Sequence, residues 1–193
     1  IDDLKAVTLS LKYEAYKLFS ADEDWSELNL YNTEPEKVTD FVVDASDIPS
    51  SLKKAVTVTL TGEWDSDAFN LLSMALGNNG GLFVTTNATL VTLDMSRIKV
   101  AENTPLWRQG LKEYGIFNNC TALEKVIMPT AEEAGHFTKL NKAFEGCTAL
   151  RDIDLSLLTG ATDIEAAFKG TAIEKADLSG CTSLGSTVSA FEG

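Results

Sequence analysis

Residues 115–193 carry a repeated sequence pattern, and this pattern constrains the fold more than any other feature of the chain. Residues 117–128 have the sequence FNNCTALEKVIM, residues 144–155 have FEGCTALRDIDL, and residues 168–178 have FKGTAIEKADL. A fourth copy begins at Ala190 with AFEG, and the steps between the phenylalanines are 27, 24 and 23 residues. A period of this length indicates one structural unit repeated along the chain.

Within each copy, apolar residues are spaced so that one side of a strand is buried. In the second copy Ile153 and Leu155 alternate as a strand requires, and Leu150 enters from the preceding turn. One copy cannot cover these residues alone, so neighbouring copies must stack and bury them together. We therefore expect Leu150 to be buried in one ladder with the apolar residues of all three copies: Leu123, Val126, Met128, Ile153, Leu155, Ile173 and Leu178.

The pattern A-F-x-G-C-T-x-L-x-x-I-x-L, clearest over residues 115–193, resembles the BspA-type leucine-rich repeats of bacterial surface proteins. The resemblance implies an α+β fold in the form of an irregular leucine-rich-repeat solenoid of about four to five coils. Residues 51–193 are assigned to this solenoid. Residues 1–50 are assigned to a β-rich N-terminal cap, because a repeat array needs a covered end. The resemblance also implies an extracellular or surface-attached bacterial protein whose export signal is not in this chain.

Upstream of the clear repeats, the sequence predicts individual strands and one helix. Val56, Val58 and Leu60 alternate as a strand does, and residues 90–95 have a similar pattern. Residues 67–76 place apolar side chains on one helical face, with an acidic N-cap at residues 65–67 and Gly77 as the stop. Further strands are predicted at residues 7–11 and 38–43 of the cap.

The charge balance restricts the class of partner. The chain has 29 acidic and 16 basic residues, a net charge of −13. Nucleic acids are excluded as expected partners, because binding to phosphates requires Lys and Arg. The acidic surface favours weak binding of cations at most. No apolar run approaches the roughly 18 residues that suggest a membrane span, so none is expected.

The cysteines fit the repeat better than they fit a metal or redox site. Cys120 and Cys147 occupy the same repeat position, where Thr171 follows, and Cys181 precedes a Thr in a similar context. No CxxC pair suggests zinc, and an odd number argues against a closed disulfide framework. We expect reduced, buried thiols, with Cys181 bonded to neither of the others. No metal and no cofactor is expected, because the sequence has no phosphate-binding loop, dinucleotide motif or metal-ligand cluster.

Three other features have both a functional and a structural interpretation. The single His136 is a candidate acid or base of a hydrolase, but a polar loop residue fits better, because no Gly-x-Ser-x-Gly motif accompanies it. Residues 22–27, DEDWSE, resemble part of a calcium loop but lack its turn glycine, which favours a solvated turn. Trp25, Trp64 and Trp107 are candidates for sugar stacking, although core packing is the commoner use.

A candidate binding site follows from the strand register. If Ile153 and Leu155 point inward, Asp154 points outward, and Asp177 of the next copy does the same. Neighbouring strands lie about 4.8 Å apart, so the two carboxylates should be near one another on one face. Arg151 and Lys175 are placed to compensate this charge diagonally. Asp154, Asp177, Arg151 and Lys175 therefore form the predicted docking face.

The sequence predicts a function without chemistry. No catalytic residues are assigned, and the leading hypothesis is an extracellular or cell-surface recognition module that binds a protein or a glycan through the repeat surface. A structural spacer or cap segment of a larger surface protein is the alternative. A hydrolase comes third.

Overall fold

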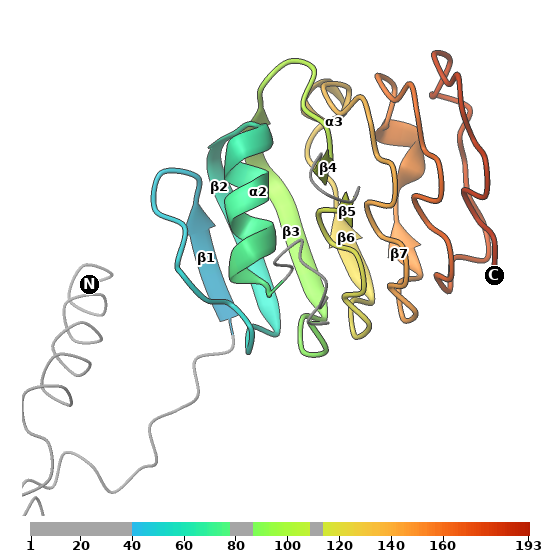
Figure 1. The fold of residues 1–193 in the computed structure, drawn as a ribbon. Helices are drawn as coiled ribbons and strands as arrows, with labels where there is room; N and C mark the ends of the chain where they lie inside the picture. The colour runs from blue at the N-terminus through green and yellow to red at the C-terminus, as the bar shows by residue number, and fades with distance from the viewer. Residues whose placement is uncertain (1–39, 78–86, 109–113) are drawn as a thin grey trace, which may run out of the picture. The chain divides into compact units, whose positions relative to one another are not determined.

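The computed structural model describes residues 40–77, 87–108 and 114–193, which lie within one compact unit, Val38–Gly193 (Figure 1). Its strands are β1 (Asp40–Asp44), β2 (Thr57–Trp64), β3 (Thr92–Val100), β4 (Trp107–Arg108), β5 (Tyr114–Gly115), β6 (Lys125–Ile127) and β7 (Asp152–Ile153). The helices are α2 (Ser66–Ala75), α3 (Ala131–Ala134) and the 3-10 turn η2 (Leu155–Leu157).

The main sheet has five strands in the order β1-β2-β3-β6-β7, and every pairing in it is parallel. The short pair β4-β5 is antiparallel. Parallel neighbours require a crossover connection of about a dozen residues or more. Between β2 and β3 this connection contains α2, which covers one face of the sheet in Figure 1.

Local sequence explains where α2 begins and ends, as predicted. The Asp65 carboxylate accepts a hydrogen bond from the backbone N–H of Ala68 at 2.9 Å, so it caps the first turn. Gly77, just beyond the last turn, has φ +103°, a conformation that glycine adopts without strain. Phe69 and Leu72 are fully buried, and Phe69 packs edge-on against Phe117 and Phe137.

The predicted fold class, an α+β leucine-rich-repeat solenoid, is wrong. The described residues form a mostly parallel five-stranded sheet with few helices, an arrangement closer to the α/β class. The physical reason is that a uniform array needs one comparable strand in each copy, and strand formation fades along the chain. β3 has nine residues, β6 has three and β7 has two.

The third copy explains the fading. Residues 172–178 form no strand, and Ala176 stands where Val126 and Ile153 stand in the other copies. Alanine lacks the branched side chain that packs a strand against its neighbour. Ile153, Ile173 and Leu178 are consequently half-buried rather than buried, contrary to prediction. The other predicted ladder residues, Leu123, Val126, Met128, Leu150 and Leu155, are buried.

The phenylalanines of the copies form a continuous column. Phe117, Phe144, Phe168 and Phe191 stack nearly parallel, with successive ring centroids 5.3, 5.7 and 5.3 Å apart. The first three are at most 1% exposed, whereas Phe191 is 40% exposed. Each ring therefore completes the burial of the one before it.

Backbone hydrogen bonds join the same segments. The N–H groups of Phe117, Phe144 and Phe168 donate to the carbonyls of Ala143, Ala167 and Ala190 at 2.8–3.0 Å. These bonds connect neighbouring copies outside the strands of the sheet. The copies are therefore held together by more than the strand pairing of the sheet.

The thiols are reduced and buried, as predicted. Cys120 and Cys147 lie side by side, and the Cys147 thiol donates to the carbonyl of Phe117 at 3.1 Å. Thr171, the next residue of this column, donates its hydroxyl to the carbonyl of Phe168 at 2.8 Å. Cys181 lies instead near the carbonyl of Leu155, at 3.7 Å.

Most of the predicted cap lies outside the described residues. These undescribed parts include the strand at residues 7–11, Val38, the acidic segment 22–27 and Trp25. Of the predicted strand at 38–43, Phe41 and Val43 lie in β1, the edge strand of the sheet. Beyond β1, the structure does not test the assignment of residues 1–50 as a cap.

Close approach of two copies generates a first prediction. A Cβ atom at Gly115 would lie 1.7 Å from the carbonyl oxygen of Lys142, so two backbones would have to separate. We expect Gly115→Ala to lower the free energy of unfolding by about 2 kcal/mol or more, measured by urea denaturation.

Gly185→Ala is the matched control, because its Cβ would meet only the Thr162 carbonyl oxygen at an ordinary 3.5 Å. Its effect should stay within about 1 kcal/mol, with either sign. Equal tolerance of both substitutions would show that the copies do not pack as closely as described.

Candidate functional site

The predicted docking residues are all exposed, but local bonds occupy the aspartates. The Asp154 carboxylate accepts from the backbone N–H and hydroxyl of Ser156 at 3.1 and 2.6 Å, which caps η2. Asp177 accepts from the backbone N–H of Ser179 at 2.9 Å, and the hydrogen bonds from Ser179 lower the pKa of this carboxyl. The two aspartates therefore hold turns at the ends of their segments.

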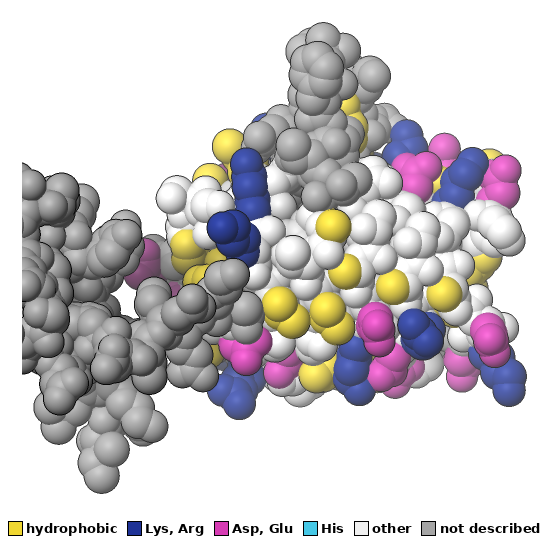
Figure 2. Space-filling view, turned by 90° about the horizontal axis from the view of Figure 1, so that it is seen from below, with side chains coloured by type: hydrophobic (Ala, Val, Ile, Leu, Met, Phe, Trp, Pro, Cys, Tyr) yellow, Lys and Arg dark blue, Asp and Glu magenta, His cyan; other side chains and the backbone are white. Residues whose placement is uncertain are grey.

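The predicted compensation by basic residues is not formed. Arg151 lies 3.9 Å from a carboxylate oxygen of Glu124, and within the described residues neither Arg151 nor Lys175 makes an ion pair with Asp154 or Asp177. The ion pair on the neighbouring strands is Lys125 with Asp152, at 2.7 Å. In Figure 2, acidic and basic side chains lie close together along one edge, as expected for a surface of locally balanced charges.

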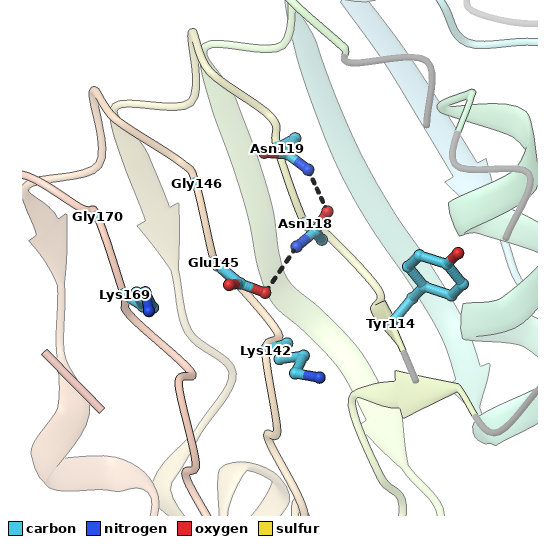
Figure 3. Close-up of a pocket in the computed structure, with 8 residues that line it drawn as sticks. All are labelled: Tyr114, Asn118, Asn119, Lys142, Glu145, Gly146, Lys169 and Gly170. Carbon is cyan, nitrogen blue, oxygen red and sulfur yellow. Dashed lines mark hydrogen bonds between the residues drawn. The ribbon is translucent and has the colours of Figure 1, made fainter. Parts of the chain in front are cut away.

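A different set of side chains converges where the phenylalanine segments turn. Asn119, Gly146 and Gly170 occupy equivalent positions two residues after successive phenylalanines, with φ of +57°, +75° and +71°. This left-handed conformation suits Gly and Asn. Since two of these residues have no side chain, a shallow hollow of about 470 Å³ opens above them. We call it the glycine hollow; its lining residues are Tyr114, Asn118, Asn119, Lys142, Glu145, Gly146, Lys169 and Gly170 (Figure 3).

The wall of the glycine hollow is a row of polar side chains, one from each copy. Asn118, Glu145 and Lys169 each follow a phenylalanine, and Glu192 continues the row. The Asn118 amide donates to Glu145 at 3.3 Å, and Lys169 pairs with Glu192 at 2.9 Å. The hydrogen bond and charge of Glu192 raise the pKa of Lys169, and Lys169 lowers the pKa of Glu192 in return.

Lys142 is the unusual residue of the glycine hollow. Its backbone has φ +58°, a region that costs a non-glycine residue about 1–2 kcal/mol. The corresponding residues of the other copies, two before each phenylalanine, are Gly115, Ala166 and Ser189, all small, and Ala166 and Ser189 have the same left-handed backbone, with φ +51° and +52°. Within the described part of the chain the Lys142 ammonium has no ion pair. In the view of Figure 3 its side chain lies below those of Glu145 and Tyr114.

Sequence reasoning missed the glycine hollow, although a signal was present. Aligning the copies on phenylalanine shows a lysine at the position where the others have Gly, Ala or Ser. The left-handed backbone that Lys142 shares with Ala166 and Ser189, and the hollow beside it, are visible only in the structure.

A second hollow, of about 420 Å³, lies beside the start of α2 and has an acidic rim that includes Asp44, Glu63, Asp65 and Asp67. Two of these carboxylates are already bonded within the fold. Asp44 accepts from Ser46 and Thr61, which lowers its pKa, and Asp65 caps α2. Among the described residues no group of three or more His, Cys, Asp or Glu is arranged to hold a metal ion.

The residues with alternative interpretations have structural roles where they are described. Trp64 is fully buried and donates its indole N–H to the Thr61 carbonyl at 2.6 Å, so it is not a sugar platform. Trp107 is half-buried, with the Lys139 ammonium 6.0 Å from its ring centroid. His136 is not a solvated loop residue, because its Nδ1 lies 2.6 Å from the carbonyl oxygen of Val100.

His136 acts together with Glu133 at the end of β3. A carboxylate oxygen of Glu133 accepts from the backbone N–H of Val100 at 2.6 Å and lies 3.9 Å from His136 Nδ1. Both polar groups of the buried Val100 backbone are thus satisfied by side chains of the next copy.

Comparisons with protein-family models, curated proteins and solved structures find no match to this chain. The resemblance to BspA-type repeats therefore remains a prediction from the residues. Of the expected absences, one has structural support: among the described residues no helix is long and apolar enough to cross a membrane.

The contact at Val100 generates a second prediction. Removing the Glu133 carboxylate leaves a buried N–H group without its acceptor, which costs about 1–3 kcal/mol. We expect Glu133→Ala to lower the free energy of unfolding by this amount in a thermal or urea titration.

Glu132→Ala is the control, because Glu132 is exposed on the same short helix and its removal changes the net charge equally. It should leave stability within about 0.5 kcal/mol of the native value. If the two variants are equally stable, Glu133 contributes only surface charge.

Proposed function

We propose that this chain is a non-catalytic recognition module that binds a protein or a glycan through the surface of its repeats, at the glycine hollow. The observation that carries the proposal is Lys142. Ala166 and Ser189 share its left-handed backbone at the equivalent positions of the next two copies, whereas Lys142 places a charged side chain there, beside the hollow.

The predicted docking face of Asp154, Asp177, Arg151 and Lys175 is a weaker candidate. Its aspartates already accept hydrogen bonds from Ser156 and Ser179, so a ligand would compete with existing bonds. The glycine hollow instead combines donors, acceptors and an aromatic ring around a concave floor.

The positions of the reactive side chains favour binding over catalysis. Burial raises the pKa of the Cys147 thiol well above its ordinary value, and burial also raises that of Cys181, so both remain protonated thiols. A thiol nucleophile requires the exposed thiolate. His136 is engaged at Val100, away from the glycine hollow. A hydrolase is therefore the least supported of the functions considered.

We also propose an extracellular or cell-surface location. This proposal rests on the resemblance of the repeats to those of bacterial surface proteins. The net charge of −13 supports the further proposal that nucleic acids are not partners.

A blocking variant tests the function. Gly170→Asn places a side chain on the floor of the glycine hollow, in a left-handed position of the kind that Asn119 already occupies. The added Cβ would meet only the Cα atom of Gly146, at 4.0 Å, so the fold should tolerate it. We expect the native protein to bind members of a glycan and protein array, and Gly170→Asn to weaken that binding at least about tenfold.

The double variant Asp154→Asn/Asp177→Asn is the comparison, since its changes lie on the other candidate surface. It should bind as the native protein does, and the thermal midpoints of both variants should stay close to the native one. If only the double variant loses binding, the site lies on the predicted docking face and not at the glycine hollow. An array without a single ligand would contradict recognition and favour a structural spacer or cap segment.

A further inference from the structure

We infer that the glycine hollow takes an acidic saccharide, whose carboxylate lies against the Lys142 ammonium. This inference rests on the proposed function, because it names the ligand class of the same site. Three observations on the described residues lead to it: the Lys142 ammonium has no ion pair, Lys169 and Glu145 already have polar partners, and no large exposed apolar side chain lines the hollow.

Among the described residues that line the glycine hollow, Lys142 is a positive group without an ion pair. Lys169 is neutralised by Glu192 at 2.9 Å, and Glu145 is held by the Asn118 amide at 3.3 Å. The Lys142 ammonium has neither kind of partner within the described residues, although the chain as a whole carries −13. An ammonium makes strong charge-assisted hydrogen bonds to anionic oxygens such as those of a carboxylate.

The groups around Lys142 fit the remainder of a sugar ring. Glu145 offers acceptor oxygens, and the side-chain amide of Asn119 offers both a donor and an acceptor. Hydroxyl groups both donate and accept, so they match such a mixed wall. Tyr114 also lines the glycine hollow, where its ring offers an apolar surface to the C–H face of a sugar (Figure 3).

The same geometry is unfavourable for a protein partner. A stable protein interface buries about 1,000 Å² or more and depends on large apolar or aromatic anchors. The exposed large hydrophobic residues of the described chain are Val42, Leu71, Met74, Val188 and Phe191, and none of them lines the glycine hollow. Its volume of about 470 Å³ is instead in the range of small-ligand sites.

A pair of ligands that differ only in charge provides the test. We would measure binding of tetragalacturonate and of its fully methyl-esterified form by calorimetry. Hyaluronan and sialylated oligosaccharides would represent other sources of the carboxylate. The native protein should bind at least one acidic saccharide, and esterification should weaken binding about tenfold or more, because it removes the charge but retains the ring.

Three lysine variants identify the group responsible. Lys142→Gln should weaken binding of the acidic saccharide about tenfold, to the level of the ester, while Lys142→Arg should retain binding within about threefold. Lys54→Gln changes the net charge equally at an exposed residue outside the glycine hollow and should bind as the native protein does. Affinity for the acid should fall with added salt, and affinity for the ester should not.

The outcomes separate this inference from the proposed function. If array ligands bind and Gly170→Asn weakens their binding, but none of the acidic saccharides binds, the function stands and the ligand class is wrong. Equal affinity for the acid and the ester, or an unchanged affinity in Lys142→Gln, would also overturn the ligand class alone. If nothing binds in either experiment, both proposals fail.

Discussion

The contact between one sequence copy and the next is the interaction on which the rest of this structure depends. No copy buries its own apolar residues, because Phe144 is covered by Phe117 on one side and Phe168 on the other. The backbone bonds of the phenylalanine segments run between copies as well. A residue that holds two copies at the correct distance therefore matters as much as the residues that fill the core. Gly115 does so through its lack of a side chain, and Glu133 does so through its bond to Val100.

The same stacking positions the glycine hollow. Since the copies are held at a fixed spacing, Asn119, Gly146 and Gly170 are aligned, and the side chains beside them form a continuous row. The interior of the stack is filled by buried apolar residues, so polar recognition groups lie on its surface. Lys142 lies next to the buried Ala143 and Phe144, and this contact with the column gives its side chain a fixed base.

The sequence allowed the apolar pattern to be predicted, because burial follows simple periodicity. Leu150, the N-cap of α2 and the buried thiols are in place for the reasons that their spacing and residue types indicate. The fold class was wrong because the α+β prediction did not follow from the order of the elements. A strand, helix and strand in succession produce parallel strands here, and the copies differ too much to maintain one strand each. The alanine at position 176, where the other copies have a branched residue, was visible in the sequence. Its effect on strand formation could not be predicted, because it depends on residues 172–178 having β7 as their one neighbouring strand.

The candidate site was harder to predict, since it depends on backbone conformation and on contacts between copies. Alternation predicted that Asp154 and Asp177 face solvent, and both are exposed. It did not predict that Ser156 and Ser179 would occupy their carboxylates, because an Asp-x-Ser turn depends on where each strand ends. That the Lys142 ammonium has no ion pair among the described residues could not be predicted either, because it depends on the positions of the charged neighbours, which no periodicity provides.

The most direct test of the account is the difference in unfolding free energy between Phe144→Ala and Phe191→Ala, measured by urea denaturation. Phe144 is 1% exposed and stacks against a ring on each side. Phe191 is 40% exposed and stacks against the ring of Phe168. If contacts between copies hold the structure together, Phe144→Ala should cost about 3–5 kcal/mol or prevent folding altogether. Phe191→Ala should cost about 1–2 kcal/mol, because less apolar surface is buried there. Equal losses in the two variants, or a loss below about 1 kcal/mol in Phe144→Ala, would contradict the central role of the phenylalanine column.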